Sequence, residues 1–221
     1  SHSRQWVIRG DSRENRIMAI SPIVVAWLSN LRSRGNLRGG SMLEMGPSDL
    51  IVYTRPAIEF YVRRHVPADN VDAVLGKLFD SQGQFRRDEI ATLFNVFGYS
   101  KYRSIDLEDP RADWHLALNH AVNISERFDA IANFGTGEHI FNIFELFRSM
   151  HGLLREGGVH LHIMPAFGDV NHGFYNIHPT AYLDVAAAND YVVEDIRYID
   201  QIDRRTAEHT RLFKDDVDFE A

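Results

Sequence analysis

Short runs of hydrophobic residues, each followed by glycine or polar residues, recur along the chain and predict buried β-strands. Runs of this length and composition are typical of strands that helices cover on both faces. The predicted strands occupy residues 41–46 (SMLEMG), 102–106 (YRSID), 127–135 (RFDAIANFG), 159–165 (VHLHIMP) and 191–199 (YVVEDIRYI), with a weaker segment at 114–118.

Hydrophobic residues at helical spacing lie between the predicted strands. The first such segment is 15–34, in which Pro22 is expected to begin or kink the helix. Further helical segments follow at 50–99 with a break at 81–84, at 138–154 and at 180–190. We interpret the repeated hydrophobic side chains of the 138–154 helix as its buried face; they are Phe141, Phe144, Phe147 and Leu154.

Strands that alternate with helices predict an α/β fold of the Rossmann-like, doubly wound kind, with a mostly parallel sheet and helices on both faces. A chain of 221 residues is long enough for one such domain, so a single domain over 1–221 is expected. Within it, 1–40 is predicted to form an N-terminal helical cap. The helical insertion at 50–85 is expected to act as a lid or as a homodimer surface.

Composition narrows the class of partner. The formal net charge is -7 and no basic run is present, which argues against nucleic acid as a partner. The absence of cysteine excludes disulfides, thiolate nucleophiles and cysteine-bound zinc. No hydrophobic run approaches the roughly 20 residues of a membrane span, and the first residues lack the apolar core of a signal peptide. We therefore expect a cytoplasmic protein that acts on a small molecule, without membrane contact.

The residues that follow each predicted strand are candidates for a ligand site, because doubly wound sheets bind ligands beyond the carboxyl ends of their strands. Glu44, Gly46 and Ser48 follow the first strand, where glycine lets the backbone approach a ligand closely. Asp106 ends the second strand and could accept both hydroxyls of a ribose. Ordinary strand-to-helix turns can have the same composition. Since a three-glycine phosphate turn is absent, the pattern favours an adenosine-containing ligand without phosphates.

Several segments together resemble class I S-adenosylmethionine-dependent methyltransferases. LEMGPSD resembles the first motif of that family, SID its ribose acid, FDAIANFG its fourth-strand motif and LLREGGVHLHIMP the segment that ends in its fifth strand. GTGEHIFN, NHGFYNIHP and AAANDY are similar to a bacterial methyltransferase-like subgroup with GTxEH and NHGFYN motifs. The resemblance covers most of 41–199. It implies S-adenosylmethionine as cofactor, with these cofactor-binding residues: Glu44, Gly46, Ser48, Asp106, Asn133 and Gly135.

The chain departs from the family pattern in two places. The ribose acid of the family usually follows the first motif by roughly twenty residues, whereas here a long insertion separates Glu44 from Asp106. The acid that the family places near adenine, at the end of the third strand, is not evident in ADWHLALN. Asp113 is the nearest candidate. The alternative to an enzyme is therefore a degenerate, non-catalytic cofactor-binding or partner protein of the same fold.

Methyl transfer requires in-line placement of an acceptor and exclusion of water. A hydroxyl acceptor also needs a base, and histidine suits this role near neutral pH. The candidate bases are His139 and His172, and the candidate acceptor-binding residues are Glu138, Asn171, Tyr175 and Asn176. The competing interpretation is a helix cap at Glu138 and a loop that binds its own backbone. The expected acceptor is a small polar molecule. Its methylated atom is expected to be the oxygen of a sugar-like or natural-product hydroxyl in preference to another atom.

Eleven histidines also raise the question of a metal site. Glu138, His139, His162 and His172 could converge, and a divalent ion would lower the pKa of an acceptor hydroxyl. No closely spaced ligand motif such as HExxH occurs. We therefore expect no metal, and we expect His160 and His162 to be hydrogen-bonded core residues.

Overall fold

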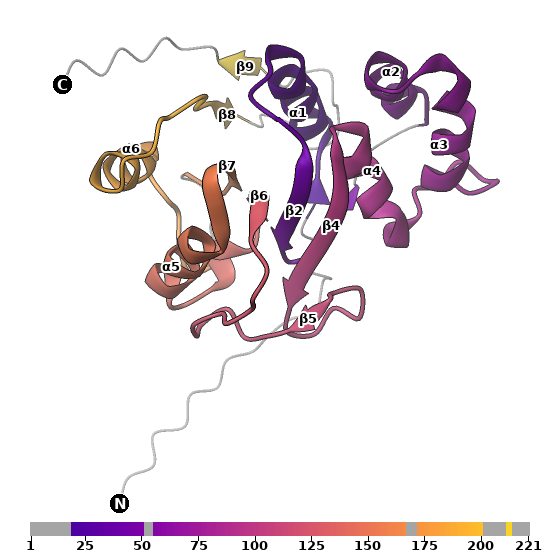
Figure 1. The fold of residues 1–221 in the computed structure, drawn as a ribbon. Helices are drawn as coiled ribbons and strands as arrows, with labels where there is room; N and C mark the ends of the chain where they lie inside the picture. The colour runs from indigo at the N-terminus through magenta and orange to yellow at the C-terminus, as the bar shows by residue number, and fades with distance from the viewer. Residues whose placement is uncertain (1–18, 51–54, 167–171, 201–210, 214–221) are drawn as a thin grey trace, which may run out of the picture.

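The computed structural model of the chain describes residues 19–50, 55–166, 172–200 and 211–213. Its centre is a five-stranded sheet in which all neighbouring strands are parallel (Figure 1). In order across the sheet, the strands are β5 (Trp114–His115), β4 (Tyr99–Asp106), β2 (Gly40–Met45), β6 (Phe128–Phe134) and β7 (Leu154–Ile163). Of these five strands, β2 comes first in the chain and is central. β4 and β5 follow on one side of it, and β6 and β7 follow on the other. This is the order of a doubly wound α/β sheet, so the predicted fold class is confirmed.

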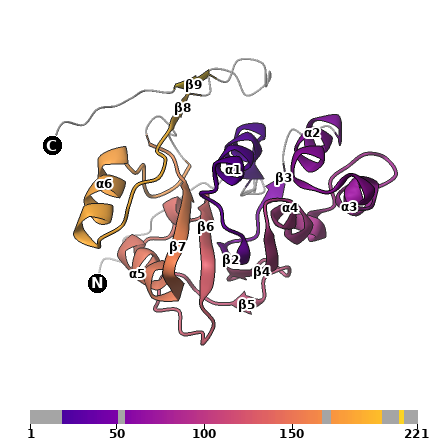
Figure 2. The same ribbon diagram turned by 45° about the horizontal axis from the view of Figure 1, so that its top comes forward.

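Alternate residues of the central strand β2 face two different helical layers. Met42 belongs to a core cluster that also contains buried residues of α1 (Pro22–Arg34), α2 (Arg55–His65), α3 (Val71–Leu78) and α4 (Ile90–Val96). Leu43 and Met45 belong to a second cluster with α5 (Ile143–Leu153). Because strand side chains alternate between faces, helices cover both faces of the sheet, as Figures 1 and 2 show.

The insertion after β2 is helical, as predicted. It follows the short strand β3 (Asp49–Leu50), which pairs in parallel with β1 (Ala19–Ile20), and it consists of α2, the 3-10 turn Ala68–Asn70 and α3. The predicted break near 81–84 is a turn in which the Asp80 carboxylate accepts the backbone N–H groups of Gln82 and Gln84 at 2.9 and 2.8 Å. Hydrophobic residues of α2 and α3 join the same core cluster as α1 and α4. The insertion is therefore packed into the main core along one side; its role as a lid or dimer surface stays a prediction.

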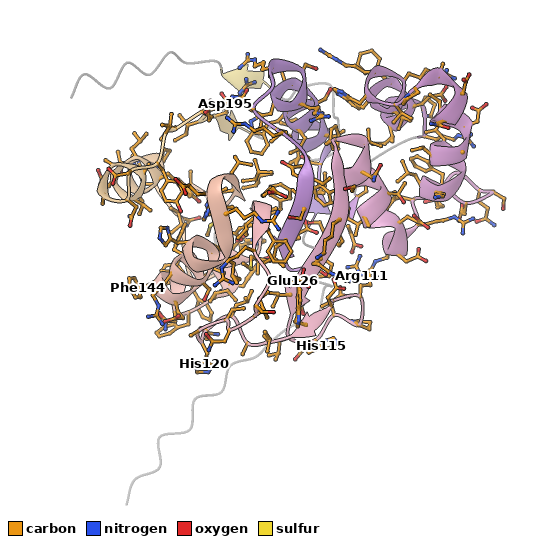
Figure 3. All side chains as sticks on the ribbon, in the orientation of Figure 1. Arg111, His115, His120, Glu126, Phe144 and Asp195 are labelled. Atoms are coloured by element: carbon orange, nitrogen blue, oxygen red, sulfur yellow. The ribbon has the colours of Figure 1, made fainter. Side chains whose placement is uncertain are left out.

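The predicted buried face of the 138–154 helix is wrong. Residues Gly137–His139 form a 3-10 turn, α5 begins only at Ile143, and Leu154 already starts β7. Phe141 and Phe144 are each 70% exposed, and Figure 3 shows Phe144 on the outer side of α5. The helix instead buries Leu146, Ser149, Met150 and Leu153. The Asn142 side chain caps the helix by accepting the Glu145 N–H, so the helix starts later than the hydrophobic pattern suggests.

The predicted strand at 191–199 is not part of the main sheet. Only Tyr198–Asp200 is a strand, β8, and it pairs antiparallel with β9 (Arg211–Phe213). The preceding residues lie against α1, where the indole of Trp27 donates to Asp195 at 2.9 Å and Asn36 donates to Glu194 at 2.7 Å (Figure 3). These side-chain bonds replace a backbone ladder, and they leave Val192 80% exposed.

The helix predicted at 180–190 is present as α6 (Pro179–Ala188). The His178 ring caps it by accepting the Thr180 N–H, and Pro179 occupies the first helical position, where a missing N–H costs nothing. In the described part of the chain, no helix combines the length and the apolar character that a membrane crossing needs.

Candidate functional site

The loops that leave β2 and β6 meet at the carboxyl edge of the sheet. Gly46 follows β2 with φ +80° and donates its N–H to Ile105 O at 2.7 Å. Gly135 follows β6 with φ +83° and donates to Ile163 O at 2.9 Å. The Thr136 hydroxyl donates to Met45 O and so joins the two exits. Positive φ at both glycines lets the chain turn sharply away from the sheet, which forms the type of crevice that binds ligands in doubly wound folds.

Glu44 lies beneath the loop after β2 and is 0% exposed. Its carboxylate accepts the Ser48 hydroxyl at 2.6 Å and the Ser48 N–H at 3.2 Å, and the Tyr102 hydroxyl donates to it as well. Burial raises the pKa of Glu44 to about 7, although the bonds from Ser48 and Tyr102 oppose the rise. In this arrangement Glu44 and Ser48 fasten the loop, and Gly46 lies buried within it.

Arg111 holds the same loop from the outside and was not singled out by the sequence. Its guanidinium donates to Pro47 O at 2.9 Å and to Ser48 O at 3.3 Å, and it pairs with Asp49 at 2.9 Å and Asp109 at 2.6 Å. Figure 3 shows it at the carboxyl end of β4. The hydrogen bonds that Arg111 donates to Asp109, together with the negative charges of Asp49 and Asp109, raise the pKa of Arg111. The local sequence LEDPRAD contains no signal that would have distinguished this residue from a solvated charge.

A hollow of about 290 Å³ lies beside this loop. It is lined by Pro47, Arg87, Asp88, Ile90, Ala91, Tyr102, Arg111 and Asp113. Ligand pockets commonly span about 300–1,000 Å³, so this hollow has a size near the lower end of that range. A second hollow of about 200 Å³, lined in part by Gly39, Tyr99 and Gly158, lies at the amino ends of β2 and β4. Only the first hollow coincides with the predicted ligand edge.

Asp106 stands at the carboxyl end of β4, as predicted. Its Oδ1 accepts the backbone N–H groups of Glu108 and Asp109, both at 2.8 Å, and no described residue donates to Oδ2. Asp113 has no oxygen left over in this way, because one oxygen accepts the Ser104 N–H at 2.9 Å and the other accepts the Arg103 guanidinium at 2.7 Å. The predicted ribose acid is therefore partly buried with one oxygen that no described residue occupies, whereas the predicted adenine acid is bonded to β4.

Asn133 ends β6 and is 0% exposed. Its Oδ1 accepts the Gly137 N–H at 2.8 Å, while its Nδ2 lies 3.1 Å from Met164 Sδ and 3.4 Å from His162 Nδ1. A Cβ at Gly137 would lie 2.7 Å from Asn133 Nδ2, so a side chain at this position would displace the Asn133 amide. Asn133 thus positions the turn Gly137–His139 from below, and its enclosed side chain makes no surface for a ligand.

That turn carries Glu138 and His139, and His172 joins them from the loop after β7. Glu138 is 2% exposed, and its Oε1 lies 3.4 Å from Nε2 of His172, whose side chain is 48% exposed. The rings of His139 and His172 have centroids 4.9 Å apart. One potential metal-ligand atom from each residue lies within 4.8 Å of the other two. The structure therefore brings these three predicted residues together.

The loop after β7 is pressed closely onto the turn. Phe174 donates its N–H to Glu138 O at 2.6 Å, and a Cβ at Gly173 would lie 2.7 Å from the same oxygen. The Tyr175 hydroxyl donates to Phe141 O at 2.6 Å. Only glycine fits this close approach. The loop is therefore held in place by its backbone and by Tyr175.

The remaining predicted acceptor residues are less informative. Asn176 is exposed, and Asn171 lies outside the described residues. The sequence missed an apolar rim beside the cluster, where the rings of Phe141 and Phe174 meet edge to face at 5.7 Å. These side chains are 70% and 64% exposed. Exposed aromatic side chains beside polar groups are typical of ligand-binding surfaces.

His162 does not join the cluster. Its ring packs against Phe147 and Tyr182, each with centroids 5.2 Å away, and the His160 ring meets Tyr191 edge to face at 5.3 Å. Burial, together with a neighbouring histidine, lowers the pKa of His162 to about 3 and of His160 to about 4. Both rings are therefore neutral near pH 7. The prediction of hydrogen-bonded core histidines is wrong for His160, whose buried Nε2 has no partner among the described residues.

Comparison with family models, with curated proteins and with solved structures found no match to this chain.

Proposed function

We propose that this chain is an S-adenosylmethionine-dependent methyltransferase that acts on a small polar acceptor, more readily on a hydroxyl oxygen than on another atom. The observation that carries the proposal is the sheet order with a glycine turn after the first strand and an acid at the end of the second. This arrangement suits an adenosine that lies across the carboxyl edge with its ribose on the acid. The motifs that resemble class I methyltransferases occupy these same strand ends.

The cofactor half of the site lies at the ends of β2 and β4. In the proposal, Asp106 Oδ2 receives a ribose hydroxyl, and the backbone at Gly46 approaches the cofactor closely. Glu44, Ser48 and Arg111 hold the loop in place through the bonds described above. When bound, S-adenosylmethionine supplies a methyl group on a positively charged sulfur that departs as a neutral thioether.

The acceptor half lies at the ends of β6 and β7. Glu138, His139 and His172 form a polar cluster there, beside the exposed rings of Phe141 and Phe174. A hydroxyl acceptor would place its polar group at the cluster and its apolar face on the rings. An imidazole of the cluster takes the hydroxyl proton as the new bond forms. Charge and composition favour a small-molecule acceptor in the cytoplasm over nucleic acid, and the helical insertion is the proposed homodimer surface.

Calorimetric titration of the purified chain with S-adenosylmethionine and S-adenosylhomocysteine tests the proposal. Binding of either at micromolar strength, which corresponds to about 8 kcal/mol, is expected. The Asp106→Ala variant should bind more weakly by roughly 1 to 3 kcal/mol, because a charged hydrogen-bond acceptor is removed. Asp72→Ala, at an exposed position of α3, is the matched control. Unchanged affinity in Asp106→Ala would remove Asp106 from the cofactor site.

The second candidate is a non-catalytic protein of the same fold. It is favoured by the fully buried Ser48, which stands where a three-glycine turn would have a later glycine and which is bonded to Glu44 by both its hydroxyl and its backbone N–H. That bonding leaves less of the loop backbone for a cofactor. Absence of binding by a folded chain, with and without divalent metal, would favour this candidate.

A further inference from the structure

We propose that Glu138, His139 and His172 form a binding site for a divalent transition-metal ion. Two imidazoles and one carboxylate are a ligand set that holds zinc, iron or related ions and leaves coordination positions open to water or substrate. The sequence contains no closely spaced ligand motif, because the ligands come from two loops that only the fold brings together. Binding of the ion does not depend on the proposed methyl transfer.

The distances fit a shared ion. Two ligands that each lie at about 2.0 to 2.1 Å from a tetrahedral metal are roughly 3.4 Å apart. Glu138 Oε1 and His172 Nε2 lie 3.4 Å apart, and the ligand atom of His139 is within 4.8 Å of both. His139 can close the remaining gap by rotation of its side chain, since it is only partly buried.

The local electrostatics also favour a cation. Glu138 is 2% exposed, so its carboxylate has lost most of its contact with water. A buried carboxylate is costly unless positive charge or hydrogen-bond donors compensate it. His172 is about half exposed, which gives an ion a route from solvent to the carboxylate. The ion would place positive charge directly beside the Glu138 carboxylate.

The segments that carry the ligands are held before any ion arrives. Asn133 fixes the turn through the Gly137 N–H at 2.8 Å, and Thr136 joins it to the end of β2. The N–H of Phe174 fixes the His172 loop on Glu138 O at 2.6 Å. Outer contacts of this kind orient metal ligands and raise affinity. Imidazole ligands point to a transition metal in preference to Mg²⁺ or Ca²⁺, which select oxygen ligands.

A metal here changes the role of the histidines in the proposed reaction. Bound imidazoles are ligands and not bases, and the ion itself lowers the pKa of a coordinated acceptor hydroxyl. The released proton goes to solvent. This consequence rests on the proposed function, whereas the metal site does not.

The test is titration of the full chain, without an affinity tag and after chelator treatment, with Zn²⁺ by calorimetry and by competition against a chromophoric chelator. One Zn²⁺ per chain is expected. Affinity should fall at least about tenfold in Glu138→Gln, His139→Ala and His172→Ala. It should be unchanged in His120→Ala, which alters an exposed histidine between β5 and β6 (Figure 3). Mg²⁺ is expected to compete poorly.

Either of two results would overturn the metal site: no stoichiometric Zn²⁺ binding by the folded chain, or equal Zn²⁺ affinity in the wild type and in His172→Ala. His172 is half exposed, so this variant is expected to fold even if substitution of the buried Glu138 does not. Circular dichroism and thermal melting verify folding in each case. Titration with S-adenosylmethionine is a separate measurement, so failure of the metal site and failure of the proposed function are distinguishable.

Discussion

At the scale of single residues, the Glu44 carboxylate is fully buried and accepts three hydrogen bonds. Burial raises its pKa from 4.5 to about 7, so the folded chain binds more protons than the unfolded chain between these values. The stability that Glu44 contributes is therefore present in full below about pH 4.5 and is lost as pH rises toward about 7. The loop after β2 should be held most firmly in mild acid.

Glu44→Gln removes this titration and keeps the shape of the side chain. The unfolding free energy of the variant minus that of the wild type should therefore increase from pH 5 to pH 8 by on the order of 1 to 3 kcal/mol. Urea denaturation at both pH values measures the change. Glu108→Gln, at an exposed position, is the matched control. A wild-type-to-variant difference that is the same at both pH values would contradict the role of buried charge.

His160 is expected to affect stability with the opposite sign. Burial lowers its pKa to about 4, below the ordinary value of 6.5, so the unfolded chain binds more protons between these values. Stability is lost as pH falls from about 6.5 toward about 4. His160→Phe keeps an aromatic ring beside Tyr191 and removes the proton-binding nitrogen. The loss of stability from pH 7 to pH 5 should shrink by on the order of 1 to 2 kcal/mol.

Chemical denaturation of wild type and His160→Phe at the two pH values measures this change. His115→Phe provides a comparison at an exposed histidine on β5. If the unfolding free energy falls as much from pH 7 to pH 5 in His160→Phe as in wild type, His160 is not the group that causes the loss of stability in acid.

The residue types of the candidate site were readable from the sequence, but the side-chain directions were not. Glycine after a strand and acid at a strand end depend only on local order, so Gly46 and Asp106 stand where predicted. Asn133 was also placed correctly along the chain, yet its amide faces inward to Gly137. Arg111 escaped notice because its partners Pro47 and Ser48 lie far away in the sequence.

At the scale of elements, α5 shows how a hydrophobic stripe can mislead. Phe141, Phe144 and Phe147 repeat every three residues, which suggested a buried face. The cap at Asn142 delays the start of the helix, and the three rings go different ways: Phe141 meets Phe174 beside the candidate site, Phe144 is exposed, and Phe147 packs against His162. Exposed aromatic residues that follow helical spacing are therefore a signal of a binding surface as well as of a core.

A pair of α5 variants tests this assignment. Leu146→Ala should destabilise the fold by about 2 to 5 kcal/mol, because Leu146 is 0% exposed. Phe144→Ala should change stability by no more than about 0.5 kcal/mol, because its side chain is 70% exposed. Denaturant unfolding of both variants is the measurement. The reverse ranking would restore the phenylalanine face as the core face.

At the scale of the whole molecule, alternation of strands and helices was sufficient to predict the parallel sheet. The exception is 191–199, where hydrophobic character suggested another strand. Whether such a segment pairs depends on a vacant neighbouring edge and on distant side chains, here Trp27 and Asn36 of the α1 region. Neither factor can be read from a local window, whereas the order of the central strands follows from short, right-handed connections.

The sheet also separates the two halves of the candidate site, with Asp106 at the end of β4 and the proposed metal ligands Glu138, His139 and His172 in the loops after β6 and β7. We therefore expect a double dissociation. Asp106→Ala should weaken binding of S-adenosylhomocysteine by roughly 5- to 150-fold, which is 1 to 3 kcal/mol, and leave Zn²⁺ affinity unchanged. His172→Ala should lose Zn²⁺ affinity and keep S-adenosylhomocysteine affinity within about twofold, because distant sites contribute independently.

Calorimetry of both ligands with wild type and the two variants gives the four comparisons. If one variant loses affinity for both Zn²⁺ and S-adenosylhomocysteine, the substituted residue supports the loops that both halves of the site share. Thr136 is the residue to test in that case, because its hydroxyl joins the β6 exit to Met45 of β2. A Thr136→Val variant tests this coupling, since it removes the hydroxyl that donates to Met45 O and should weaken both ligands together only if the halves are coupled through Thr136.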